Sequence, residues 1–466
     1  MDYIFYDTET TGLETAFAQI LQFAAIKTDE NLNELERFDI RCRLQPHIVP
    51  SPGAMLVTKI SPEVLVDPQL PSHYVAFQQI RKKLISWSPA IIVGYNSLAF
   101  DEEILRQAFF QTLQPTYLTN TDGNQRSDVM RIMHAVSIYQ PNTISVPTDA
   151  KGKETFRLPQ LAPANGHNHD HAHEALADVE ATIYLAQLAK DRAPDIWKIM
   201  HRSVQKNDVA EYVTSQPCFA LTERYFSKTY SWLVTYCGTN PKINSQMAVF
   251  DLNFDPNDYR SLSVGQLVDV LNESPKVIRT LTTNKLPIMM PAECAPEGTR
   301  ALNISENVRI SRIECIHNDR KFMQRVGEAL SLRYADRVAS PYAEKRIYDG
   351  FPDRSDETLM SEFHEAGWED RVGLAEQIQD DRLAEFAYRL MYFERPDILS
   401  SNKLSVLKTW LNDRVLTDDE TVPWMTIKKA LLEVNQKLEV AKGSDAAFLK
   451  DTKKFLTDRI GSLNAV

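Results

Sequence analysis

Residues 3–12 read Tyr3-Ile4-Phe5-Tyr6-Asp7-Thr8-Glu9-Thr10-Thr11-Gly12. The apolar run at the start has the length and composition of a buried strand, and the Thr/Gly sequence after it is typical of a turn. Because successive side chains on a strand alternate between faces, Asp7 and Glu9 point to the same side. Neighbouring carboxylates repel each other, and a divalent cation such as Mg²⁺ would relieve that repulsion. The pattern therefore suits a metal site, and the alternative is a pair of solvated acids at a strand end.

The chain that follows alternates between strand-like and helix-like stretches up to about residue 190. Apolar runs predict strands over residues 20–26, 38–44 and 90–95. Helical periodicity or a helix-starting acid predicts helices over residues 74–86, 100–110, 127–135 and 173–188. Strands and helices in this alternation indicate an α/β layer fold.

The remainder of the chain has two different characters. Pro194 marks a domain boundary, and residues 215–291 show short β-rich runs broken by turns, which predicts a small barrel-like or mixed domain. From about Tyr342 the pattern is helical, with the 3.6-residue period over residues 381–392, 426–440 and 446–460. We therefore expect three domains, over residues 1–193, 194–343 and 344–466.

Composition indicates a soluble globular protein, since 43% of the 466 residues are hydrophobic and 25% are charged. No apolar run approaches the roughly 18 residues that span a bilayer, and no export signal precedes the first strand. The five cysteines are scattered and form no CxxC pair, which argues against a disulfide framework and a structural zinc site. We expect a cytoplasmic protein without membrane association.

The net charge of −11 is unusual for a protein that binds a polyanion. The charge is unevenly distributed, however, because residues 194–343 carry 18 Lys and Arg against 16 Asp and Glu. Within that region, Arg300 to Arg346 holds ten basic residues against six acidic ones. A local basic stripe can supply phosphate contacts, so the overall charge does not exclude a nucleic acid as ligand.

Three further residues belong with the acidic pair. Asp101 follows the strand predicted over residues 90–95, where the helix dipole also favours an acid without any function. His173 and Asp178 lie five residues apart at the start of an amphipathic helix, and each has an ordinary alternative as a polar residue of the first turns. The upstream histidines His167, His169 and His171 raise a rival interpretation, a His-rich metal tract, which we disfavour because no matching Cys/His set follows.

Taken in order, acid-x-acid on a first strand, an acid after a later strand and His-x4-Asp at a helix resemble the DEDDh superfamily of 3′→5′ exonucleases. Within it, the chain is similar to the bacterial exonuclease I family. The stretches that carry this similarity are Pro52 to Ile60, Gly94-Tyr95-Asn96, Ser127 to Arg131, Phe156-Arg157-Leu158, Ala164-Asn165-Gly166 and Tyr348-Asp349-Gly350-Phe351. The resemblance covers most of the chain and implies an RNase H-like catalytic domain, an SH3-like β-rich domain and an all-helical C-terminal domain.

The resemblance also implies a mechanism. Four carboxylates can hold two Mg²⁺ ions, with Mn²⁺ as a substitute, about 3.5–4 Å apart. Asp7, Glu9 and Asp178 are the expected direct ligands, Asp101 completes the ligand set of the second metal ion directly or through water, and His173 is the expected general base. A neutral imidazole suits that role near pH 7–8.

For the substrate, the resemblance implies single-stranded DNA cut processively into 5′-mononucleotides, in DNA repair and recombination. Arg157 resembles the family's substrate-binding arginine, and Glu9, Thr10, Gly12 and Leu56 are expected against the terminal nucleotide. Three further residues, Arg106, Tyr117 and Arg131, resemble strand contacts, although Arg106 and Arg131 have the alternative of ordinary surface cations. The family also docks the acidic C-terminal tail of single-stranded DNA-binding protein, which we expect between Arg300 and Arg346 of a monomer.

Two alternatives stay open at this point. An RNA-trimming exonuclease of the same superfamily differs by its handling of the 2′-hydroxyl, which the sequence does not reveal. An inactive scaffold that binds single strands would keep the fold without the reaction, although all five catalytic positions are occupied here.

Overall fold

The computed structural model describes residues 1–168, 174–225, 227–333 and 338–464. The first part is built on a five-stranded sheet in the order β3-β2-β1-β4-β5. The antiparallel strands are β1 (Tyr3–Thr10), β2 (Ile20–Thr28) and β3 (Glu34–Arg41). The remaining two, β4 (Ile91–Gly94) and β5 (Gln125–Asp128), run parallel to β1. The central strand is therefore the one that carries Asp7 and Glu9.

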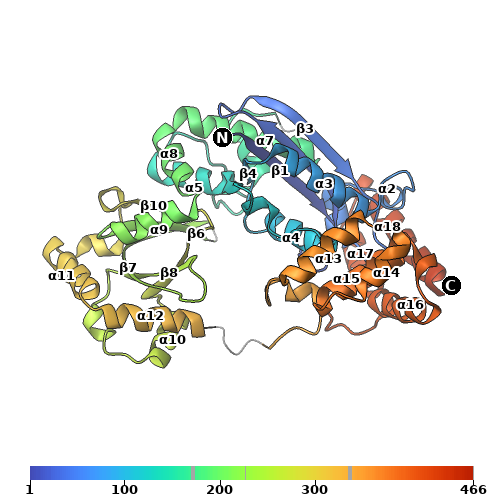
Figure 1. The fold of residues 1–466 in the computed structure, drawn as a ribbon. Helices are drawn as coiled ribbons and strands as arrows, with labels where there is room; N and C mark the ends of the chain where they lie inside the picture. The colour runs from blue at the N-terminus through green and yellow to red at the C-terminus, as the bar shows by residue number, and fades with distance from the viewer. Residues whose placement is uncertain (169–173, 226, 334–337, 465–466) are drawn as a thin grey trace.

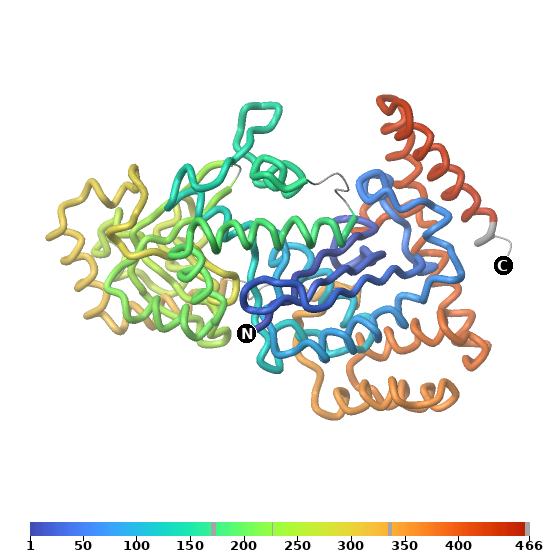
Figure 2. The backbone as a smooth tube through the Cα atoms, turned by 90° about the horizontal axis from the view of Figure 1, so that it is seen from above, coloured from blue at the N-terminus to red at the C-terminus, as the bar shows by residue number. Residues whose placement is uncertain are grey.

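Helices cover both faces of this sheet, as the predicted α/β layers require. One face is covered by α3 (His73–Trp87) and α4 (Asp101–Gln111), and the other by α5 (Val129–Tyr139) and α7 (Ala175–Arg192). Side chains of β1 alternate between the two cores: Ile4 and Tyr6 pack with α3 and α4, whereas Phe5 packs with α5 and α7. Figure 2 shows α7 (green) running across the sheet. The alternation directs Asp7 and Glu9 to the α7 side and Thr8 to the α4 side.

Short helices connect these elements. They are α1 (Pro52–Thr58), α2 (Pro62–Leu65) and α6 (Leu158–Ala164). Three sequence predictions differ from the structure here. The third strand is β3 at Glu34–Arg41 instead of residues 38–44, and the last helix of this part begins at Ala175. The helix predicted over residues 127–135 begins at Val129, because Ser127 and Asp128 belong to the unpredicted strand β5.

The second part contains an antiparallel sheet in the order β10-β6-β7-β8-β9. Its strands are β6 (Phe219–Tyr225), β7 (Lys228–Thr239), β8 (Gln246–Asp251), β9 (Ile278–Thr282) and β10 (Ile288–Pro291). The accompanying helices are α8 (Pro194–Arg202), α9 (Lys206–Ser215), α10 (Val264–Asn272), α11 (Glu306–His317) and α12 (Arg320–Leu332). Because α8 packs on α5 and α7, Ile196 and Met200 belong to the core of the first part. The boundary after residue 193 stays a prediction.

The third part is helical. Its helices are α13 (Arg354–Glu365), α14 (Arg371–Ala375), α15 (Asp381–Glu394), α16 (Ser401–Leu416), α17 (Ile427–Leu438) and α18 (Gly443–Asn464). Figure 1 shows the second and third parts flanking the first on different sides. Shared apolar clusters join the third part to the first: Tyr74 and Phe110 pack with Phe363 and Phe386.

Candidate active site

Three carboxylates converge between β1 and α7. Asp7 and Glu9 extend from β1 toward α7, and Asp178 comes from the first turn of that helix. Each of the three offers an oxygen, and these oxygens lie within 4.8 Å of one another. The predicted convergence of Asp7, Glu9 and Asp178 therefore holds in the structure.

Burial and mutual repulsion make this cluster electrostatically unfavourable on its own. Glu9 is 7% exposed, and loss of hydration together with the charges of Asp178 and Asp101 raises the pKa of its carboxyl to about 8. Desolvation and the charges of Asp101, Asp178 and Glu9 likewise raise the pKa of Asp7 well above its usual range. Oxygen donors at this spacing suit a hard divalent cation, which would offset the repulsion. No second such group of His, Cys, Asp and Glu ligands occurs in the described part of the chain.

Asp101 stands beside this cluster without being part of the three-oxygen group. It is the first residue of α4, where it is 7% exposed, and the Thr8 hydroxyl donates a 2.6 Å hydrogen bond to its Oδ1. Burial raises the pKa of Asp101 to about 7 despite the opposing effect of this hydrogen bond. The charge of Asp101 in turn contributes to the raised pKa values of Asp7 and Glu9.

The expected general base, His173, lies outside the described residues, as do His169 and His171. His167 is described, and its ring lies 4.9 Å from that of Tyr184. Because His169 and His171 lie outside the described residues, the interpretation of this stretch as a metal tract stays untested.

The turn after β1 is hydrogen-bonded to the start of α1, which in turn contacts the third part of the chain. Thr10 donates through its Oγ1 to the carbonyl of Gly12 at 3.1 Å, and the Ser51 amide donates to the Thr11 carbonyl at 2.8 Å. Ser51 caps α1, the helix that carries the half-buried Leu56. The carboxylate of Glu433 on α17 accepts from the Gly53 amide at 2.9 Å. The predicted nucleotide contacts Thr10 and Gly12 thus lie in one segment and Leu56 in another, and the hydrogen bond between Ser51 and Thr11 joins the two segments.

Arg157 is exposed at the N-terminal end of α6, where its side chain is accessible to a ligand. Arg106 differs from the expected surface cation: it is 7% exposed and forms a 2.8 Å ion pair with Glu102. Burial of an arginine is favourable when a carboxylate neutralises it, and Glu102 does so from one helical turn away. The alternative of Arg106 as an exposed cation is wrong, and its contact with a strand stays a prediction.

Tyr117 packs between the Arg106 guanidinium, 5.1 Å from its ring centre, and the ring of Phe351 at 5.4 Å. Arg131 donates to the Leu286 carbonyl at 3.3 Å and lines a cavity of about 530 Å³ between the first and second parts. The same cavity is lined by Asn96, Arg224, Tyr225 and Lys285.

Sequence reasoning missed several of these groups. The Thr8 hydroxyl has no role assigned from the sequence, although the alternation of a strand places it on the α4 side, where Asp101 lies. Lys285, whose Nζ donates to the Leu98 carbonyl at 2.9 Å, comes from a distant part of the chain. No local pattern signals such a contact.

No helix in the described ranges is both long and apolar enough to cross a bilayer.

Comparison with known proteins gives a consistent result. The exonuclease family model (RNase_T) matches residues 4–186. Exodeoxyribonuclease I of Escherichia coli is 26% identical over 374 residues, which cover 77% of this chain and 78% of the relative.

Two solved structures share the whole fold. Exonuclease I from Methylocaldum szegediense is 24% identical with a TM-score of 0.83, and E. coli exonuclease I in complex with a dA16 oligonucleotide is 22% identical with a TM-score of 0.84. Each alignment covers 98% of this chain and 99% of the other. The predicted fold class, an RNase H-like domain with an SH3-like and a helical domain, is confirmed. The exonuclease family model thus accounts for residues 4–186, and over most of its length the chain is similar to exodeoxyribonuclease I proteins.

Proposed function

We propose that the chain is a single-strand-specific 3′→5′ exodeoxyribonuclease that releases 5′-mononucleotides processively and acts in DNA repair and recombination. The observation that carries the proposal is the cluster of half-buried Asp7 with buried Glu9 and Asp178, within the region that matches the exonuclease family model. Such a cluster serves phosphodiester hydrolysis, in which water attacks phosphorus, the bond to the 3′ oxygen of the next nucleotide breaks, and that oxygen takes up a proton.

Two Mg²⁺ ions are the proposed cofactor, with Mn²⁺ as a substitute. Asp7, Glu9 and Asp178 would hold them, and Asp101 would complete the ligand set. When bound, divalent ions polarise the scissile phosphate, acidify a water molecule and stabilise the charge of the leaving oxygen. The raised pKa values of Asp7 and Glu9 support this assignment, because a cation removes the repulsion that causes them.

The chain's own residues then divide the remaining tasks. His173 accepts the proton of the attacking water as general base. Arg157 binds phosphate, with its guanidinium matching two phosphate oxygens. Thr10, Gly12 and Leu56 lie against the terminal nucleotide and present it to the carboxylates.

The 530 Å³ cavity is the proposed path of the strand beyond the active site. Its walls bring together Arg131 and Lys285 as cations with Tyr225 as an aromatic surface. Tyr225 and Tyr230 are 48% and 41% exposed, and the ring of Tyr230 stacks on Trp232 at 6.1 Å. Cations along a backbone and flat rings for bases are the usual means of binding single strands without sequence preference. The oligonucleotide complex of E. coli exonuclease I supports DNA as the ligand.

The acidic C-terminal tail of single-stranded DNA-binding protein is the proposed protein partner. A similar solved structure is that of SSB/exonuclease I in complex with an inhibitor. On α11 and just before it, the exposed apolar residues Leu302, Val308 and Ile310 lie among the basic residues that begin at Arg300. An acidic tail with apolar residues would find both kinds of partner there. We propose that the enzyme itself is a monomer.

The test compares single-stranded DNA, duplex DNA and RNA, each labelled at the 3′ end, with Mg²⁺ or with EDTA. We expect release of mononucleotides from single-stranded DNA in Mg²⁺ alone, and loss of release in Asp7→Asn. Release from RNA in preference to DNA would support the RNA-trimming alternative. Binding of DNA without release under any condition would support the inactive scaffold.

A further inference from the structure

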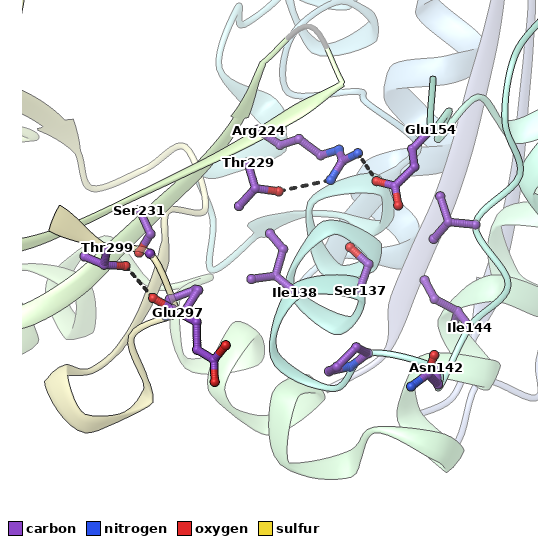
Figure 3. A pocket seen from close by; sticks show the side chains of 14 residues that line it. Ser137, Ile138, Asn142, Ile144, Glu154, Arg224, Thr229, Ser231, Glu297 and Thr299 are labelled. Carbon is purple, nitrogen blue, oxygen red and sulfur yellow. Dashed lines mark hydrogen bonds and ion pairs between the residues drawn. The ribbon is translucent and has the colours of Figure 1, made fainter. Parts of the chain in front are cut away.

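Arg224, at the end of β6 in the second part, reaches across to the loop that carries Arg157 in the first part. Its Nη2 lies 2.5 Å from Glu154 Oε2, and its Nη1 donates to Thr229 Oγ1 at 3.1 Å. Figure 3 shows the guanidinium between these two partners. Its central carbon also lies 4.7 Å from the ring centre of Phe156. The Arg224 side chain is 7% exposed, whereas that of Glu154 is 53% exposed. A planar guanidinium can donate hydrogen bonds along its edge while its flat face stacks on an aromatic ring, whereas an ammonium group has no such face.

The residues that Arg224 contacts lead directly into Arg157. Glu154 is bridged to Thr148 across the same loop, which makes a small hairpin. The carbonyl of Phe156 accepts a short hydrogen bond from the Tyr95 hydroxyl, and its ring lies 4.5 Å from His134. Phe156 is buried, and the next residue, Arg157, faces solvent. The orientation of the Arg157 backbone is thus set by how Glu154 and Phe156 are held. Tyr95 and His134 hold Phe156 from within the first part, and Arg224 contacts both Glu154 and Phe156 from the second.

We propose that Arg224 is a positioning residue, which fixes the Glu154–Phe156 segment so that Arg157 meets the substrate phosphate. The inference rests on the proposed function, because it takes Arg157 as a phosphate ligand. It makes the second sheet a structural support of the active site, in addition to its proposed contacts with the strand.

A direct contact between Arg224 and DNA is the competing explanation, since Arg224 also lines the 530 Å³ cavity. Glu154 separates the two explanations. It lines a different cavity of about 550 Å³, on the other side of Arg224, and not the one through which the strand is proposed to pass. Loss of the Glu154 charge therefore weakens the support of Arg157 while it leaves Arg224 available to DNA.

The experiment measures kcat and KM on a short single-stranded oligonucleotide for Arg224→Ala, Glu154→Gln and Arg157→Ala, and for the double variant Arg224→Ala/Arg157→Ala. We expect KM to rise roughly three- to tenfold in the first two variants, part of the contribution of a charge-assisted hydrogen bond, with kcat changed less. The double variant should be no worse than Arg157→Ala alone, because Arg224 acts through Arg157. The variant Arg224→Lys should be intermediate, since it keeps the charge but loses the face-on contact with Phe156.

The control is Arg260→Ala, which removes another ion pair of the second part, to Asp319 at 3.1 Å, away from this loop. It should leave KM unchanged. An unchanged KM in Glu154→Gln, or an Arg224→Ala effect that persists in the Arg157→Ala background, would overturn the inference. If Arg224→Ala does not fold, Glu154→Gln alone decides, because Glu154 is exposed. Failure of the proposed function would look different, since the unmodified protein would then release no nucleotides from single-stranded DNA.

Discussion

Replacement of Glu9 by glutamine should stabilise the metal-free protein while it weakens metal binding. The pKa of Glu9 is raised from 4.5 to about 8 in the folded state, mainly by burial and by Asp178. A carboxyl with a raised folded pKa contributes most stability below its unfolded pKa, and that contribution is lost as the pH rises through the folded pKa. The loss for Glu9 therefore develops between pH 4.5 and pH 8. At pH 7 ionised Glu9 therefore lowers the free energy of unfolding by about 3 kcal/mol, since each pH unit above the unfolded pKa of 4.5 costs about 1.4 kcal/mol.

The assay is urea unfolding in EDTA at pH 5, 6, 7 and 8, for the unmodified protein and for Glu9→Gln. The difference in the free energy of unfolding between the two isolates Glu9 from the other titrating groups. We expect the variant to be more stable, with the difference growing from pH 5 to pH 8. Addition of Mg²⁺ should then stabilise the unmodified protein more than the variant, because a ligand that binds the folded state alone raises its stability.

Glu63→Gln is the matched control, because Glu63 is an exposed acid on the short helix α2. It should change stability little at any of these pH values. The reasoning fails if Glu9→Gln is less stable than the unmodified protein in EDTA, or if the difference does not depend on pH.

Three further predictions concern other buried groups. Thr8→Val removes the 2.6 Å hydrogen bond to Asp101 and should lower the affinity for Mn²⁺, measured by calorimetry, roughly three- to tenfold. Thr8→Ser keeps the hydroxyl and should keep the affinity. The pKa of buried His73 is lowered to about 3, so the folded protein should lose stability as the pH falls from 6.5 toward 3, by up to about 1.4 kcal/mol per pH unit. His73→Leu should flatten that part of the urea unfolding profile, and an unchanged slope would contradict the assignment. Glu344→Ala and Glu344→Gln should each cost about 3–5 kcal/mol in urea unfolding, because both remove the charge that neutralises buried Arg389 and Arg414 at 2.9 and 2.8 Å. A large loss in Glu344→Ala with none in Glu344→Gln would show that the charge is unimportant.

The central strands and the amphipathic helices were predictable because burial leaves a periodic pattern in the sequence. The run from Tyr3 to Tyr6 became the start of β1, and residues 74–86 became α3 with one more residue at each end. The strand β5 was missed because its four residues, Gln125 to Asp128, are all polar. Arg126 is nevertheless buried there, since it forms a 3.0 Å ion pair with Glu102 on α4. A strand whose burial depends on a distant partner leaves no apolar pattern to find.

In the candidate site, too, features with a local sequence pattern could be predicted, and contacts with distant residues could not. That Asp7 and Glu9 share a side could be predicted from strand alternation, and the addition of Asp178 followed from the resemblance to the DEDDh superfamily. The burial of Arg106 could not, because a helix pattern does not reveal that Glu102, Asn120 and Tyr348 surround it. The pair of Arg224 and Glu154 is 70 residues apart in the sequence and depends on how two parts of the chain meet. Contacts of this kind follow from tertiary packing, which local sequence patterns do not encode.

The hydrogen bond that the Gly53 amide donates to Glu433 has a consequence for attempts to shorten this nuclease. A fragment that ends near residue 193 would keep Asp7, Glu9, Asp101 and Asp178, yet α1 would lose the acid that caps its first turn. The fragment would also bare Met55 and Leu65, which now pack against Phe448 and Phe455 of α18, as Figure 2 lets the reader follow where the red helices meet the blue loops. The last helices thus support the segments beside the catalytic carboxylates, and a shortened enzyme would need a redesigned surface there to remain active.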